Sequence, residues 1–256
     1  MTGAAAPAAV PAGLSASARV AAGPGGTLPV LAGDGPLALR RTRAAGPYAQ
    51  VTLVGAMSAP LGGDRLRLAA EARPGAALRI TSAAAMVALP GRGGGAARFD
   101  TELTVRQGGE LRWLPEPLIS ARGSELVTHA RIDLAADARL VFREEQVLGR
   151  SGEEGGRLTS RITVRWAGRT VLDQELSTGP GAPGWDGGAV LGGHRAVGQL
   201  LVVDPAAYGE GGRPAEPRPL GGTAALLPLA GAPAVLVTAL APDALALRRL
   251  LDTVTP

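Results

Sequence analysis

The residues of this chain that can do chemistry are mostly carboxylates on predicted turns and strands. Asp64 ends the tight turn Leu61-Gly-Gly-Asp64, where a short carboxylate can accept hydrogen bonds from turn amides. Glu144 and Glu145 interrupt an otherwise apolar strand, and because adjacent residues of a strand face opposite sides, one of them must point inward. A buried carboxylate is costly unless it has an arginine partner or a water-filled path beside it. Glu116 is a further acidic group, held between two prolines.

Each of these carboxylates also has a structural interpretation. Asp64 can simply close its turn, and Glu144 can pair with an arginine such as Arg143 or Arg139 and hold two sheets together. The sequence leaves both interpretations open beside a functional one.

Other residue types exclude several kinds of site. The two histidines, His129 and His194, are 65 residues apart and have no histidine three or four residues away, so a three-nitrogen zinc site cannot be built from them. The absence of cysteine excludes disulfides and thiolate metal sites and fits a reducing compartment. The glycine-rich run 91–95 lacks the Gly-Lys-Ser/Thr ending of a phosphate-binding loop. No Gly-x-Ser-x-Gly motif of a serine hydrolase occurs.

The composition favours one mainly β domain. Of the 256 residues, 46% are hydrophobic but only 3% are aromatic, and 38 glycines with 21 prolines indicate many turns. The net charge of +4 comes from interspersed acids and arginines, so no basic stripe indicates a nucleic-acid partner. No apolar run is long enough to span a membrane. We expect a disordered tail over residues 1–13, a single domain over 14–256, and a cytoplasmic location.

Alternating apolar and polar residues predict strands that recur around turns. Strands over 64–73 and 76–81 flank Pro74-Gly75, and similar pairs flank Gly109 and Asp137. We predict these pairs to be hairpins, and their repetition to give two stacked sheets, β-helix-like or sandwich-like. An ordinary β-sandwich is the alternative.

The other predicted elements complete the chain. They are strands over 15–20, 35–41 and 50–54, a hairpin of 161–166 with 169–176, a long loop over 178–193, a strand over 194–203, a mobile segment over 208–222, and strands over 224–229 and 234–240.

A short C-terminal helix is predicted from Asp243 onward. Its apolar stripe contains Leu247, Leu250 and Leu251, and Arg248 lies beside it. A lone helix of this kind either packs on a sheet or docks a partner, and we expect partner contact through these four residues.

Several short motifs, taken in order, resemble the UreD/UreH family of urease accessory proteins over about residues 14–252. They are Gly35-Pro-Leu37, Leu61-Gly-Gly-Asp-Arg-Leu66, Pro74-Gly-Ala76 with Ile80-Thr-Ser82, Gly109-x-Leu-x-Trp-Leu-Pro115 with Ile119, Ala138-Arg139 with Glu144 and Leu148-Gly-Arg150, and Asp243-Ala-Leu-Ala-Leu-Arg248. The chain departs from the family in having Ala83-Ala-Ala-Met-Val-Ala88 where members usually carry a lysine- and aromatic-containing run.

The resemblance implies a stacked β protein that is not an enzyme. Such proteins bind accessory proteins of the UreF type and of the UreG type, the latter a nickel-carrying GTPase, and they dock on apo-urease. A water-filled passage through the subunit is the proposed nickel route. We therefore expect no tightly bound cofactor and Ni²⁺ only in transit. Asp64 and Glu144 are the first candidates to contact it, with Thr81, Ser82 and Glu116 as second candidates.

Two other functions compete with this one. The first is a stacked-β enzyme acting on polysaccharide with paired carboxylates such as Glu144 and Glu116, which the scarcity of aromatic rings disfavours. The second is a structural partner-binding module without a metal role. The ligand inventory favours weak metal binding in any case, because nitrogen and sulfur ligands are what hold nickel tightly.

Overall fold

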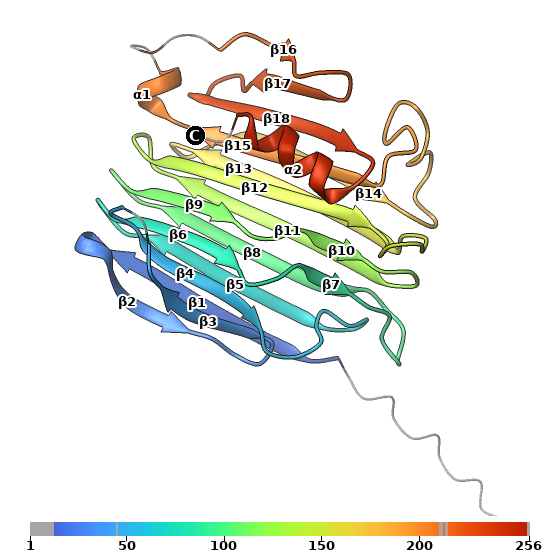
Figure 1. Cartoon of the computed structure of the whole chain (residues 1–256). Coiled ribbons are helices and arrows are strands. Elements are labelled where there is room, and N and C mark those ends of the chain that lie inside the picture. The colour runs from blue at the N-terminus through green and yellow to red at the C-terminus, as the bar shows by residue number, and fades with distance from the viewer. Residues whose placement is uncertain (1–12, 45, 210–211, 213–214, 255–256) are drawn as a thin grey trace, which may run out of the picture.

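Two β-sheets face each other around a shared apolar core, and through the middle of the molecule the strands of both are stacked in chain order (Figure 1). The computed structural model describes residues 13–44, 46–209, 212 and 215–254. Sheet A contains β1 (Ser15–Gly23), β2 (Thr27–Ala32), β5 (Arg65–Ala72), β8 (Ala97–Val105), β11 (Glu125–Leu134), β13 (Arg157–Trp166) and β14 (Arg169–Thr178).

Sheet B is the larger sheet. It contains β3 (Leu37–Thr42), β4 (Ala49–Gly55), β6 (Ala77–Ser82), β7 (Met86–Ala88), β9 (Glu110–Leu114), β10 (Leu118–Ser120), β12 (Arg139–Leu148), β15 (Ala196–Val203), β16 (Arg218–Pro219), β17 (Ala224–Pro228) and β18 (Ala234–Ala241). The helices are the 3-10 turn η1 (Pro24–Gly26), α1 (Pro205–Tyr208) and α2 (Ala244–Asp252).

The chain coils between the two sheets, which makes the fold a β-solenoid and confirms the predicted mainly β, stacked two-sheet architecture. In sheet A, β5, β8, β11 and β13 pair in parallel, and in sheet B, β4, β6, β9 and β12 do the same. Along the chain, these eight parallel strands alternate between the two sheets.

The three predicted hairpins around Gly75, Gly109 and Asp137 are wrong. The strands on either side of each turn lie in different sheets, so each turn is a corner of the coil. A glycine turn between two alternating segments suits a corner as well as a hairpin, because the pattern records burial and not the pairing partner. The predicted hairpin of β13 and β14 is confirmed.

Most other predicted elements are confirmed, but four strands were missed. The strands β2, β7, β10 and β16 were not predicted, whereas the loop after β14 and the C-terminal helix lie where they were expected. The predicted tail over 1–13 falls outside the described residues except for Gly13. The segment over 208–222 contains β16, and its residues 210–211 and 213–214 also lie outside the described part.

The core lies between the sheets and follows the alternation of each strand. On β12, Leu140 and Phe142 belong to this core, whereas Val141 packs on the opposite, outer face of sheet B. Helix α2 covers that outer face over β12, β15 and β18 (Figure 1) and is capped by Asp243, whose carboxylate accepts a hydrogen bond from Ala246 N at 2.8 Å. Among the described residues, the helices are too short and too polar to cross a bilayer.

Sheet B is interrupted beside the middle of β12, and this break positions the site described below. Strands β9 and β10 pair with the two ends of β12, and the segment 115–117 between them makes no ladder with it. The next layer repeats the break, since 83–85 separates β6 from β7. We call the break formed by 83–85 and 115–117 the window.

Candidate functional site

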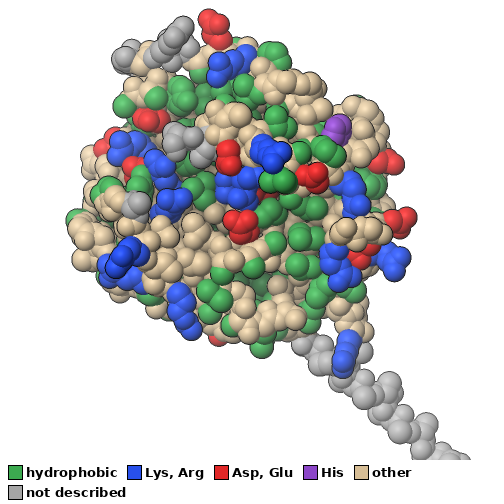
Figure 2. Space-filling model, in the orientation of Figure 1, with side chains coloured by type: hydrophobic (Ala, Val, Ile, Leu, Met, Phe, Trp, Pro, Cys, Tyr) green, Lys and Arg blue, Asp and Glu red, His purple; other side chains and the backbone are tan. Residues whose placement is uncertain are grey.

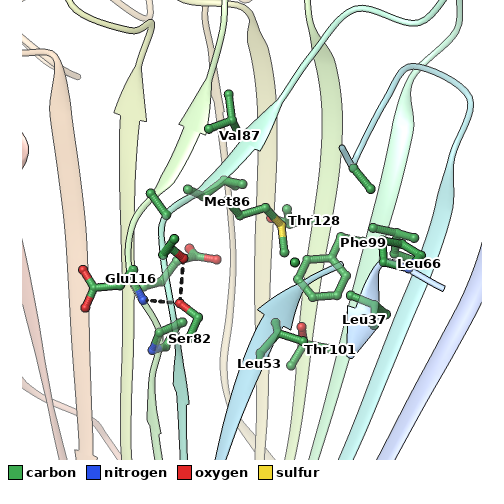
Figure 3. Close-up of a pocket in the computed structure, with 18 of the residues that line it drawn as sticks. Leu37, Leu53, Leu66, Ser82, Met86, Val87, Phe99, Thr101, Glu116 and Thr128 are labelled. Atoms are coloured by element: carbon green, nitrogen blue, oxygen red, sulfur yellow. Dashed lines mark hydrogen bonds between the residues drawn. The ribbon is translucent and has the colours of Figure 1, made fainter. Parts of the chain in front are cut away.

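A cavity of about 440 Å³ passes through the window into the space between the sheets, and we call it the inner cavity. Its walls are largely apolar: Figure 3 shows the Phe99 ring between Leu37, Leu53 and Leu66, with the Met86 side chain pointing toward it. The wall on the β12 side carries Glu144 instead. The inner cavity thus leads from the outer face of sheet B to a carboxylate between the sheets.

The edges of the window are held together by Ser82. Its Oγ accepts a hydrogen bond from Glu116 N at 2.8 Å and donates one to Ala84 O at 3.0 Å (Figure 3). These bonds join the two segments of the window, so Ser82 and Glu116, both predicted candidates, are brought together here. The Glu116 side chain is 42% exposed at the outer rim.

A cluster of charged groups covers the outer side of the window. Arg248 of α2 donates to Glu145 Oε1 at 2.6 Å and to Glu116 Oε2 at 3.3 Å, and Arg143 donates to Asp252 at 3.1 Å. Burial lowers the pKa of Arg143. The pKa of Arg248 is raised, because Arg248 donates hydrogen bonds to Glu145. Figure 2 shows acidic and basic side chains interspersed on this face. The pairing predicted for a carboxylate of β12 thus applies to Glu145, which faces outward.

Glu144 is the carboxylate that faces inward. Its Oε2 accepts hydrogen bonds from Ser160 Oγ at 2.9 Å and from Gln146 Nε2 at 2.8 Å. Among the described residues, Glu144 forms no ion pair with an arginine. It lies deep between the sheets but keeps accessible surface because it borders two cavities. Burial raises the pKa of Glu144, and the two hydrogen bonds oppose that rise.

Two further spaces continue from Glu144. A narrow cavity of about 20 Å³, which we call the constriction, is lined by Glu144, Gln146, Ser160, Gln174 and Gln199 together with apolar neighbours. A more open space of about 550 Å³, the outer groove, shares Gln174 and Gln199 with it. The inner cavity and the constriction share Glu144, and the constriction and the outer groove share the two glutamines, so the three spaces lie in series.

Asp64 and Thr81 lie apart from this series. Asp64 is 4% exposed, and its two oxygens accept hydrogen bonds from Leu14 N and Leu61 N, both at 2.8 Å. It joins the first strand to the turn, which favours the structural interpretation. Thr81 is on the outer face of sheet B, where its hydroxyl lies 3.2 Å from that of Thr52. Neither residue lines any of the three cavities.

The structure places half of the predicted partner stripe against the sheet. Leu247 and Leu251 are fully buried on sheet B, so they are not available to a partner while α2 is docked. Arg248 is engaged in the charged cluster, and Leu250 is half-buried. Leu245, on the outward side of the same helix, is 61% exposed.

No cluster of three or more histidines and acids that could hold a metal ion occurs among the described residues. The two histidines are far from forming one: His129 Nε2 is 3.0 Å from Thr163 Oγ1, and His194 Nδ1 is 2.8 Å from Leu191 O. Burial and nearby arginines lower the pKa of His129. The described residues therefore offer no cluster of the kind that holds Ni²⁺ tightly.

Sequence reasoning missed several residues of the site. The missed residues lie on four strands and belong to no recognisable sequence motif. They are Gln146 on β12, Ser160 on β13, Gln174 on β14 and Gln199 on β15. The one usable signal was the alternation of β12, which places Gln146 on the same face as Glu144.

The comparisons with known proteins converge on one family. The family described as "UreD urease accessory protein" matches residues 14–255. A "Urease accessory protein UreD" of Streptomyces avermitilis is 65% identical over 252 residues, covering 94% of this chain and 96% of the relative. Its counterpart in Streptomyces coelicolor is 62% identical with 94% and 95% coverage, and one in Parafrankia is 42% identical with 86% and 79% coverage.

Proposed function

The chain belongs to the UreD family of urease accessory proteins, and we propose that it guides Ni²⁺ to apo-urease through its interior. As a urease accessory protein it is not an enzyme, so the carbohydrate-active alternative is set aside. In this proposal it works in the cytoplasm as a subunit of a complex with UreF-type and UreG-type proteins, the latter being the GTPase that supplies the ion.

The observation that carries the proposal is the position of Glu144. It lies between the sheets at the point where the inner cavity meets the constriction, and it is held by neutral hydrogen-bond donors instead of an arginine. A carboxylate needed only for packing would be expected to have a cationic partner, as Glu145 does on the other face of the same strand.

The chemistry of the route suits an ion in passage. A carboxylate beside water lowers the energy of a nearby divalent cation, and a single oxygen ligand group does not trap it. Glu144 supplies this charge in the interior, and Glu116 supplies it at the rim of the window, with the Ser82 hydroxyl beside it. We do not place Asp64 or Thr81 on the route, because both lie outside the three cavities.

Partner contact at the C-terminal helix stays a prediction. With Leu247 and Leu251 buried on the sheet, a partner would meet the outward side of α2, where Leu245 is 61% exposed and Leu250 is half-buried. An exposed leucine on a short helix suits an apolar contact with a helical partner of the UreF type.

The proposal is tested by activating urease with and without this chain. Urease subunits and the other accessory proteins are co-expressed with the unsubstituted chain, with Glu144→Gln, or without the chain, and nickel per urease active site is counted by mass spectrometry. We expect the chain to be required, and Glu144→Gln to assemble normally but to deliver several-fold less nickel, because the variant keeps the shape of the side chain and loses its charge.

The matched control is Glu154→Gln, which removes the same charge from an exposed position away from the three cavities. Full nickel delivery by Glu144→Gln would refute the interior route. Delivery that fails together with complex assembly would favour the alternative of a structural module without a metal role.

The isolated chain should bind Ni²⁺ weakly. Calorimetry on untagged protein is expected to give a dissociation constant no tighter than roughly micromolar, about −8 kcal/mol, because no cluster of three or more histidines and acids occurs among the described residues. A stoichiometric nanomolar site would show storage of nickel and not passage.

A further inference from the structure

The narrowest part of the interior series is built by side chains from four strands. Glu144 of β12 and Gln199 of β15 are direct partners across an antiparallel pair. From the opposite sheet, Ser160 of β13 donates to Glu144 at 2.9 Å, and Gln174 of β14 donates through Nε2 to Gln199 Oε1. Two side-chain hydrogen bonds therefore cross between the sheets next to each other.

The pair Gln174–Gln199 separates the constriction from the outer groove. Both glutamines line both spaces, whereas Glu144 lines the constriction and the inner cavity. The constriction has about 20 Å³, and a cavity needs about 10–15 Å³ to hold one water molecule. A hydrated divalent ion is larger than one water, so it cannot pass while the pair is closed.

A buried acceptor in the constriction indicates what the space receives. Gln146 is 3% exposed, and its Nε2 donates to Glu144, which fixes the orientation of the amide. Its Oε1 has no hydrogen-bond partner in the described part of the chain. An unpaired buried carbonyl oxygen is satisfied by a water or a cation. With the Glu144 carboxylate beside it, the constriction is lined by oxygen acceptors, the ligand type that hard divalent cations and water use.

We propose that Gln174 and Gln199 form a gate on the route, and that a divalent cation passes by replacing their mutual hydrogen bond with contacts to their carbonyl oxygens. This inference rests on the proposed function. The two carboxamides suit a gate because they are neutral and so do not trap the ion, and because their long side chains can rotate. One neutral hydrogen bond is also a weak closure compared with an ion pair.

The absence of cysteine from the chain allows a direct test. The variant Gln199→Cys is purified and treated with benzyl methanethiosulfonate, which attaches a benzyl group to the thiol through a disulfide, and dithiothreitol removes it again. Each form is then mixed with the other accessory proteins, apo-urease, GTP and Ni²⁺, and the nickel bound to urease is counted. We expect the labelled form to deliver at least tenfold less nickel than the reduced form of the same variant.

The reversible label makes each sample its own control, and Thr170→Cys, at an exposed position of β14, is the matched variant whose labelling should have no effect. Equal delivery by labelled and reduced Gln199→Cys overturns the gate. The gate is also overturned if the thiol of Gln199→Cys reacts only in urea, because the position would then not be reachable from the outer groove. It is likewise overturned if the labelled chain no longer assembles with its partners. If the unsubstituted chain itself delivers no nickel, the proposed function fails and the gate fails with it.

Discussion

The docking of α2 depends on a residue without a side chain. Gly198 of β15 faces the helix, and a Cβ at this position would lie 2.9 Å from Leu251 Cδ1 and 3.0 Å from Leu247 Cδ1. Carbon atoms in contact prefer about 3.5–4.0 Å, so Gly198→Ala forces the helix or its two leucines to shift by several tenths of an ångström. The expected result is a strained but still docked helix.

The magnitude follows from two opposing effects. Overpacking a tight core costs about 1–3 kcal/mol, while replacing glycine by alanine restricts the unfolded chain and contributes about 0.4–1 kcal/mol of stability. The net loss for Gly198→Ala is therefore between about 0 and 2.6 kcal/mol. The loss of stability cannot exceed the cost of undocking α2 completely, which would expose Leu247 and Leu251 at about 1.5–3 kcal/mol each.

The control is Gly55→Ala at the end of β4, where a Cβ would meet no atom within 4 Å. It should gain only the unfolded-chain effect, so the difference between the two variants isolates the packing against α2. Urea unfolding followed by tryptophan fluorescence measures both, and trypsin cleavage after the exposed Arg249 reports helix undocking. Equal free energies of unfolding for the two variants would refute the close approach of helix and strand.

Three other predictions concern the carboxylates. Glu145→Gln should cost about 3–5 kcal/mol in urea unfolding, because it leaves two partly or fully buried arginines short of their anion, whereas Glu71→Gln in an exposed pair should cost about 0–1 kcal/mol; similar values would refute the buried pairing. Asp64→Ala should destabilise the fold by about 1–3 kcal/mol for each of the two backbone donors that it leaves unpaired, as measured by thermal unfolding; an unchanged melting temperature would contradict its structural role. For Glu144, the pKa in the folded state is raised above the ordinary value of 4.5, so the stability of the unsubstituted protein falls as the pH rises above that value. Glu144→Gln should therefore be the more stable protein at neutral pH, and its advantage should vanish below pH 4.5. A stability difference independent of pH would count against the raised pKa.

Local patterns in the sequence predicted the strands but not their partners. The alternation around β12 correctly required one of two adjacent glutamates to face inward, and the cap at Asp243 marked the last helix. The pairing of Glu145 with Arg248 could not be predicted, because 103 residues separate them and a charge on a strand does not specify its partner. The constriction was hidden for the same reason: it needs the register that puts Glu144 opposite Gln199.

The size of the inner cavity argues that water fills it. An empty space of about 440 Å³ would cost about 10 kcal/mol at roughly 24 cal/mol for each Å³, which is comparable to the whole stability of a typical domain, about 5–15 kcal/mol. The window resolves this conflict, because the break in sheet B opens the space to solvent at Ser82 and Glu116. Water in the cavity in turn makes an unpaired carboxylate tolerable at Glu144. The broken sheet, the hydrated interior and the inward carboxylate are thus parts of one arrangement, which a solenoid built only for packing would not require.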